Sequence, residues 1–123
     1  MAEVAANNVY PDANPWLDLS GYLVNGWNAD ALTRSVKALV DGNTVTLSGS
    51  LVTGDPKAAF TLPVGLRPAN PETFVAHLRD IGTVECQILT GGRFYVPPYS
   101  YNPLGGFPAG EILLFSVTYQ RRA

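Results

Sequence analysis

Two runs of alternating apolar and polar residues follow each other near the middle of the chain, and they give its clearest local signal. The runs are RSVKALV and NTVTLSGSL, and the pair Asp41-Gly42 separates them. Alternation on both sides of an Asp-Gly pair predicts a β-hairpin with a two-residue turn. The cross-strand pairs that this register predicts are Val40 with Asn43, Ala38 with Val45, and Val36 with Leu47 on one side of the hairpin.

The first of these runs also allows a helix. Leu32, Val36, Leu39 and Val40 follow helical spacing, and Asp30 could cap the helix at its N-terminus. The turn and the run that follows it favour the strand. We therefore expect a strand and keep a helix over residues 32–40 as the alternative.

Four more segments predict β-strands. Residues 58–62 and 74–78 are short candidates, and a proline-rich connection that cannot continue a ladder separates them. Residues 83–89 alternate, with Val84, Cys86 and Ile88 on one face, so we expect Cys86 in the core. The last candidate covers residues 111–119. The pattern predicts an all-β protein, an antiparallel β-sandwich or jelly-roll-like knob.

The last candidate strand is apolar on both faces near its start. A strand with one face in water would not tolerate this pattern, so we expect one face in the core and the other against a second subunit or a second layer. The candidate interface residues are Ile112, Leu114 and Phe115.

Residues 97–110, PPYSYNPLGGFPAG, are too rich in proline and glycine to predict regular structure. Four aromatic residues lie in or beside this segment and could stack on sugar rings or fill pockets of a protein partner. The alternative is that they close one end of the sandwich. The candidate ligand or partner residues are Tyr95, Tyr99, Tyr101 and Phe107.

The first residues of the chain show little periodicity. Chain ends are ordered where something holds them, so we expect residues 1–15 to form an extended docking arm and residues 16–123 to form the sandwich domain. Trp16 and Trp27 would pack the exit of the arm onto the core. The candidate docking residues are Val4, Val9, Tyr10 and Trp16.

Composition narrows the class of function. The 123 residues suffice for one domain with a hydrophobic core. A formal charge of -2, without a long run of either sign, argues against nucleic acid as a partner. The start of the chain has no apolar signal segment, and no stretch is apolar enough for a membrane span. We expect a protein that is made in the cytoplasm and does not insert into a membrane.

Candidate chemistry is sparse. Cys86 alone cannot form an internal disulfide, and with His77 it cannot supply the usual ligands of a structural zinc site. A nucleophile would need His77 as a base, but a single histidine beside Arg79 and Asp80 more often serves packing or a surface hydrogen bond. No pair of carboxylates has a distinctive spacing, and no phosphate or dinucleotide loop is present. We expect no enzyme, no catalytic residue, no metal and no cofactor.

Three motifs carry a resemblance to a known class of protein. They are W-x-D-L-x-G-Y-L-V-N-G-W at residues 16–27, V-T-L-S-G-S-L at 45–51 and F-T-L-P-V-G-L-R-P at 60–68. The third is the most specific, because Pro63, Gly65 and Pro68 fix an unusual corner. In this order, and over residues 16–119, they resemble the small β-rich virion-surface modules of tailed bacteriophages that infect Gram-positive hosts.

The resemblance implies a β-sandwich or jelly-roll knob that assembles as a homotrimer on the virion surface, without catalytic residues. We expect first a trimeric capsid decoration protein, which its N-terminal arm anchors to capsid or tail proteins. The alternative is a tail-tip or tail-fibre module that binds a receptor, a glycan of the host cell wall.

Overall fold

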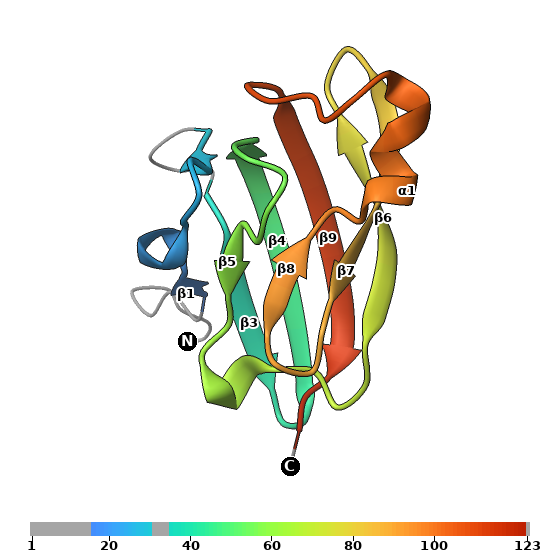
Figure 1. Ribbon diagram of the computed structural model, residues 1–123. Helices are drawn as coiled ribbons and strands as arrows, with labels where there is room; N and C mark the ends of the chain where they lie inside the picture. The colour runs from blue at the N-terminus through green and yellow to red at the C-terminus, as the bar shows by residue number, and fades with distance from the viewer. Residues whose placement is uncertain (1–15, 31–34, 123) are drawn as a thin grey trace, which may run out of the picture.

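Nine antiparallel strands form one sheet in the computed structural model, which describes residues 16–30 and 35–122 (Figure 1). The strands are β1 (Leu17–Asp18), β2 (Asn28–Ala29), β3 (Lys37–Asp41), β4 (Thr44–Val52), β5 (Phe60–Thr61), β6 (Glu72–Leu78), β7 (Gly82–Ile88), β8 (Arg93–Tyr95) and β9 (Ile112–Gln120). Their order in the sheet is β1-β3-β4-β9-β6-β7-β8-β5, and β2 pairs with β4 outside this path. The prediction of an all-β antiparallel fold is confirmed.

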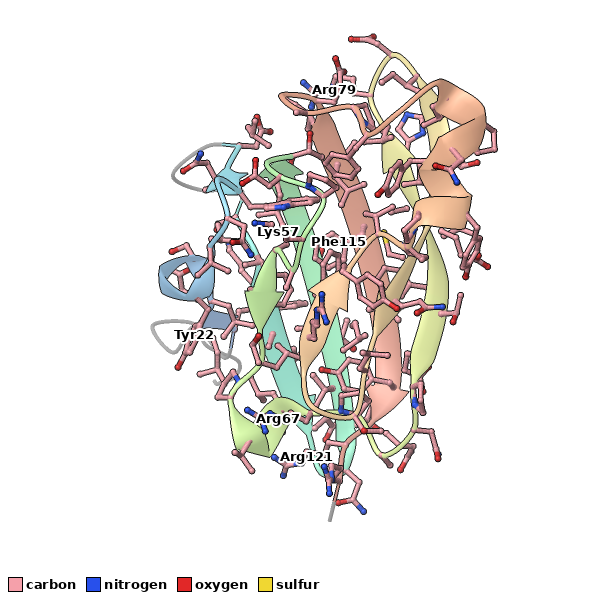
Figure 2. All side chains as sticks on the ribbon, viewed as in Figure 1. Tyr22, Lys57, Arg67, Arg79, Phe115 and Arg121 are labelled. Carbon is pink, nitrogen blue, oxygen red and sulfur yellow. The ribbon has the colours of Figure 1, made fainter. Side chains whose placement is uncertain are left out.

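The sheet curls until its two halves face each other. In Figure 1, β5 and β8 lie in front of β3, β4 and β9. Phe60 of β5 stacks on Phe94 of β8 with 4.7 Å between ring centroids, and Phe94 lies 4.9 Å from the ring of Phe115 on β9. These rings fill the space between the two halves, where Phe115 is labelled in Figure 2. The two layers of the predicted sandwich are thus halves of one curled sheet.

The hairpin forms with the predicted faces but with a different turn. Asp41 pairs with Thr44, so the two-residue turn is Gly42-Asn43 and not Asp41-Gly42. Gly42 has a φ of 61°, which suits the first position of a turn that has glycine there. A shift of two residues keeps every side chain on its face because the strand period is two. The apolar pairs are therefore Val40 with Val45 and Ala38 with Leu47.

The helical alternative for residues 32–40 is wrong where the structure describes that segment. Residues 37–41 form β3, which pairs with β4 along its whole length. Helical spacing would place Leu39 and Val40 on one face, whereas in the strand these two neighbours point to opposite faces of the sheet. Pairing in the sheet decides the conformation of a short run that fits both patterns.

The strand at residues 83–89 is confirmed as β7. Val84, Cys86 and Ile88 are buried and face the core, and burial together with the neighbouring carboxylate of Glu85 raises the pKa of the Cys86 thiol to about 12. Cys86 is therefore a neutral core residue near pH 7.

The end of the first motif packs against the segment that follows β4. Asn25 and Gly26 both have positive φ, as a tight Asn-Gly turn requires, and the Trp27 indole Nε1 donates to the Asp55 carbonyl at 2.9 Å. Gly54 lies so close to the backbone of this turn that a Cβ at residue 54 would meet the Gly26 carbonyl carbon and, at 2.6 Å, the Trp27 nitrogen. Glycine at position 54 allows the two segments to touch.

Candidate functional site

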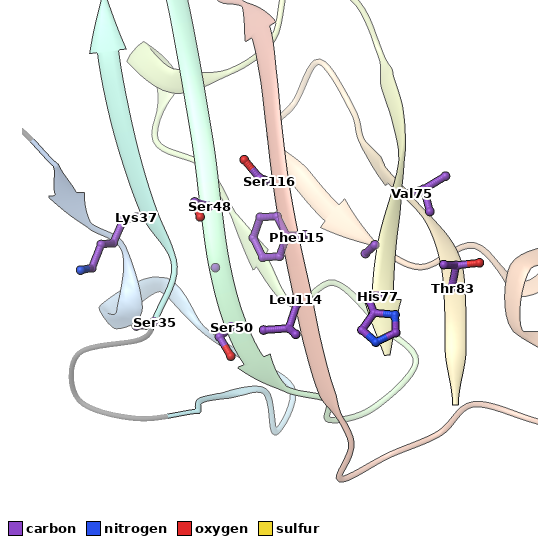
Figure 3. A pocket seen from close by; sticks show the side chains of 12 residues that line it. Ser35, Lys37, Ser48, Ser50, Val75, His77, Thr83, Leu114, Phe115 and Ser116 are labelled. Carbon is purple, nitrogen blue, oxygen red and sulfur yellow. The ribbon is translucent and has the colours of Figure 1, made fainter. Parts of the chain in front are cut away.

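A groove of about 560 Å³ crosses the outer face of the curled sheet (Figure 3). This volume lies in the range of small-ligand sites. We call it the serine groove, and it is defined by the following residues: Ser35, Lys37, Ser48, Gly49, Ser50, Val75, Ala76, His77, Thr83, Leu114, Phe115 and Ser116.

The register of the strands places these side chains in rows. Lys37, Ser48 and Ser116 are paired neighbours on β3, β4 and β9. The next row runs across four strands for about 14 Å. It consists of Ser50, Leu114, His77 and Thr83. Figure 3 shows the labelled side chains of both rows on the same face of the sheet.

The groove is hollow for two reasons. Its outward positions on β4 are serines, whose short side chains rise little above the surface of the sheet. In addition, β6 and β9 pair only through His77 with Leu114 and Leu78 with Leu113, so the described strands separate beyond that point. The ring of Phe115 closes the gap from the inner side, where it occupies the place that a Gly49 side chain would take.

The polar groups of the groove differ in how they are satisfied. The Ser50 hydroxyl donates to the Asp30 carboxylate at 2.8 Å, and Asp30 lies 4.0 Å from the Arg79 guanidinium. The Ser35 hydroxyl is buried at 7% exposure of the residue and has no hydrogen-bond partner within the described part of the chain. A buried hydroxyl without a partner costs free energy, which a ligand that bonded to it would recover.

A cluster of aromatic and amide side chains lies beside the groove on β7, β8 and the short helix α1 (Pro98–Tyr101). The Tyr95 hydroxyl donates to Gln87 Oε1 at 2.6 Å, and Gln87 Nε2 donates to the Tyr99 hydroxyl at 3.1 Å. The Arg93 guanidinium lies 5.3 Å from the centre of the Tyr95 ring, a cation–π arrangement. Tyr99 is 57% exposed, and its hydrogen bond to Glu85 raises the pKa of its hydroxyl. We call these side chains, together with Glu85, the tyrosine cluster.

The serine groove and the tyrosine cluster are parts of one surface. Val75, which is 65% exposed in the groove, pairs with Glu85 of the cluster. His77 pairs with Thr83, two residues before Glu85 on the same face of β7. A ligand longer than one ring could therefore touch both.

Two of the four candidate ligand residues do not belong to this surface. The ring centroid of Phe107 lies 5.0 Å from that of Tyr101, in an edge-to-face contact, and 5.9 Å from that of Trp27. Both Phe107 and Tyr101 pack against the core. These two residues close one end of the molecule, as the alternative stated. Tyr95 and Tyr99 point outward.

The segment at residues 97–110 is also more regular than its composition predicted. It begins with α1, whose first residue is Pro98, and continues with a 3₁₀ turn over Asn102–Leu104. Proline fits the first position of a helix because its φ is preset and that position needs no donor. The Ser100 hydroxyl accepts a hydrogen bond from the Glu85 backbone N–H, so α1 covers the edge of β7 beyond β8.

The expected subunit interface is corrected at one residue. Phe115 points inward, is 6% exposed and packs on Phe74 and Phe94, because neighbours in a strand alternate between faces. Ile112 and Leu114 share the outer face and are half-buried.

The candidate docking arm falls almost wholly outside the described residues. Val4, Val9 and Tyr10 belong to residues 1–15, of which the structure gives no description. Trp16 is half-buried just before β1. Trp27, by contrast, is buried at 2% exposure, in agreement with the packing role predicted for it.

The described residues show neither a metal-binding cluster nor a membrane-spanning helix. Residues 16–30 and 35–122 contain no group of three His, Cys, Asp or Glu side chains that could hold a metal ion. The same residues form no helix that is both long enough and apolar enough to cross a membrane.

Sequence reasoning missed most of the serine groove. The available signal was the small hydroxyl residues at alternate positions, Thr44, Thr46, Ser48 and Ser50, which mark a low outward face of β4. The contribution of His77, Leu114 and Ser116 depends on which strands become neighbours.

Comparison with known proteins gives a fold likeness. No family model matches the chain, and no curated protein matches it. A similar solved structure is that of the receptor binding protein gp15 of Listeria phage PSA, with a TM-score of 0.59 and 15% sequence identity. The match covers 88% of this chain and 65% of the gp15 chain, so this chain spans less than two thirds of the length of gp15. At this identity, the likeness shows the fold.

Proposed function

We propose that this chain is a receptor-binding module on the virion surface of a tailed bacteriophage, and that it binds its ligand in the serine groove and on the tyrosine cluster. The observation that carries the proposal is the fold likeness to a phage receptor binding protein over 88% of the chain. The three sequence motifs support the same class of virion protein.

This proposal takes the second of the two functions expected from the sequence. The likeness is to a receptor binding protein, and it gives no specific support to capsid decoration. The surface chemistry also favours ligand binding, because the groove is concave and holds a buried hydroxyl without a partner among the described residues.

The groove suits a ligand that has both hydroxyl groups and apolar ring faces, as the glycans of a host cell wall do. Ser35, Ser48, Ser116 and Thr83 offer hydroxyls that can donate or accept. Val75 and Leu114 of the same groove offer apolar contacts to the faces of the ligand rings. Tyr99 adds an exposed ring beside the groove, and Tyr and similar side chains combine an apolar face with a polar tip.

A groove-filling variant tests this proposal. In Ser116→Trp a large ring would occupy the groove, and we expect binding to isolated host cell walls and to a glycan array to be lost. Gln120→Trp is the matched control, since it places the same ring on the same face of β9 about 13 Å away. Equal wall binding by the two variants, with both folded, would refute the groove as the receptor site.

Tyr99→Phe addresses the cluster without disturbing the core. It removes the hydroxyl that accepts from Gln87 and leaves the exposed ring in place. We expect weaker wall binding with unchanged stability. Tyr101→Ala does not serve this purpose, because Tyr101 packs against the core and its loss would destabilise the fold.

The homotrimer and the docking arm are parts of the same proposal. Of the three expected contacts between copies, Ile112 remains the candidate, because Phe115 points into the core and Leu114 lies in the groove proposed to bind the ligand. Light scattering of the purified chain should give three times the monomer mass. Removal of residues 1–15 should abolish co-sedimentation with phage tail or capsid proteins, and continued co-sedimentation would contradict the role of the arm.

A further inference from the structure

Three arginines gather around a second pocket, at the end of the molecule where the chain finishes. The pocket has a volume of about 550 Å³ and is lined by Asn43, Val64, Gly65, Arg67, Arg121 and Arg122. In Figure 2, Arg67 and Arg121 lie at this end, and Arg79 lies at the opposite end. The pocket is thus separate from the serine groove, with which it shares no lining residue.

The fold brings these arginines together from distant parts of the sequence. The corner after β5 contains a 3₁₀ turn over Val64–Leu66 and ends at Arg67. The chain after β9 then runs beside this corner, because the Arg122 backbone N–H donates to the Arg67 carbonyl at 3.0 Å. The Arg121 backbone N–H donates to the Asn43 carbonyl at 2.7 Å, which adds the hairpin turn to the same site.

Each guanidinium is held by one backbone carbonyl. Arg67 Nε donates to the Leu62 carbonyl at 2.9 Å, Arg121 to the Gly65 carbonyl at 3.2 Å and Arg122 to the Thr90 carbonyl at 3.3 Å. A guanidinium has five N–H donors, so each arginine is positioned and keeps most of its donors. Gly92 leaves room for the Arg67 guanidinium, because a Cβ at residue 92 would lie 3.0 Å from Arg67 Nε.

The charges of this pocket are not balanced by its own residues. No Asp or Glu lines it, and within the described residues none of the three guanidiniums has a carboxylate within 4.0 Å. Three of the eight basic residues of a chain with net charge -2 are therefore concentrated at one site. The three positive charges repel each other, and a bound anion would offset this electrostatic repulsion.

We propose that this arginine pocket is a binding site for a phosphate group, either free phosphate or a phosphate ester. Guanidiniums match the oxygens of phosphate with paired hydrogen bonds. A phosphate carries up to two negative charges and three oxygen acceptors, so it can satisfy several arginines at once. One carboxylate offers a single charge and two oxygens, which fits a group of three guanidiniums less well.

The test is a titration of the full chain with inorganic phosphate in a phosphate-free buffer of constant ionic strength, followed by calorimetry and by the NMR signals of the arginine side chains. Glycerol 3-phosphate and dimethyl phosphate are titrated in parallel, to distinguish a terminal phosphate from a phosphodiester linkage. We expect saturable binding that shifts the signals of Arg67, Arg121 and Arg122.

Matched variants locate the site. In Arg121→Gln/Arg122→Gln both backbone N–H bonds remain, and we expect phosphate to bind at least about tenfold more weakly, since hydrogen bonds to charged groups are lost. Arg122→Gln alone is the milder variant if the double one does not fold, because Arg122 is exposed. Arg79→Gln removes the same charge at the opposite end and should leave the affinity unchanged.

Three results would overturn the proposal. The first is absence of saturable binding of all three phosphates by the unaltered chain. The second is an equal loss of affinity in Arg79→Gln, which would mean that phosphate responds only to net charge. The third is a change of oligomeric state in Arg121→Gln/Arg122→Gln without phosphate binding by the unaltered chain, which would make the pocket a contact between copies. None of these results depends on the receptor role of the serine groove.

Discussion

Gly49 and Phe115 form an interlocking pair that sets the floor of the serine groove. They face each other on β4 and β9, and the Phe115 ring lies over the glycine. A Cβ added at Gly49 would stand 2.6 Å from Cε1 and 2.9 Å from Cζ of that ring. The ring has little freedom to retreat, because it packs on Phe74 and Phe94 with centroid distances of 6.0 and 4.9 Å.

The size of the effect follows from these contacts. Overpacking a filled core costs about 1–3 kcal/mol. Alanine in a strand recovers about 0.5–1 kcal/mol of the entropic cost of glycine. Gly49→Ala should therefore lower the free energy of unfolding by about 1 kcal/mol and by no more than about 2.5 kcal/mol. Phe115→Leu lacks Cε1 and Cζ, and the nearest remaining atom is the Val36 Cα at 3.3 Å, so the same alanine should cost much less in that background.

A double-mutant cycle measures this coupling. Urea unfolding of the unaltered chain, Gly49→Ala, Phe115→Leu and the double variant, followed by tryptophan fluorescence, should give an interaction free energy of about 2 kcal/mol. If Gly49→Ala costs the same in both backgrounds, the ring does not fill the place of the missing side chain. The account of the groove floor would then be wrong.

Three further changes test single features of the fold. Gly54→Ala should unfold the protein at a much lower urea concentration than Gly21→Ala, because a Cβ at residue 54 meets backbone and one at residue 21 meets nothing within 4 Å. Cys86, with its thiol pKa raised to about 12 by burial, should not react with a thiol reagent at pH 8 until the chain unfolds; reaction of the folded chain would contradict its core position. Burial also raises the pKa of Tyr119 above its ordinary value of 10.0, so the folded state holds the proton longer than the unfolded state. Its stabilising contribution is complete below pH 10 and should fall by up to about 1.4 kcal/mol per pH unit above it. Cys86, whose pKa is also raised by burial, adds a loss of its own in this range, so Tyr119→Phe should reduce the alkaline loss and Tyr22→Phe should not, as shown by urea unfolding at pH 8 to 11.

The candidate site divides into residues that the sequence could identify and residues that it could not. Tyr95 and Tyr99 belong to an aromatic segment that stands out by composition. Phe107 comes from the same segment, but it packs against Trp27, which lies 80 residues away in the chain. No local pattern separates the aromatic residue that closes the core from the one that faces outward.

The arginine pocket shows the same division. The corner with Pro63, Gly65 and Pro68 is evident in the sequence, and it contains Arg67. The two arginines at the end of the chain look like an ordinary charged terminus. Their place beside Arg67 depends on the path of β9 and on the hydrogen bond between Arg122 and Arg67.

Residue alternation alone predicts the all-β class, the faces of β3, β4 and β7, and the burial of Cys86, because the side-chain period of a strand is two and is visible locally. The turn at Gly42-Asn43, the rows of the serine groove and the meeting of three arginines follow only from the fold of the whole chain. The physical reason is that alternation tells which face a side chain takes, whereas the partner strand is selected by packing and hydrogen bonding over the whole sheet.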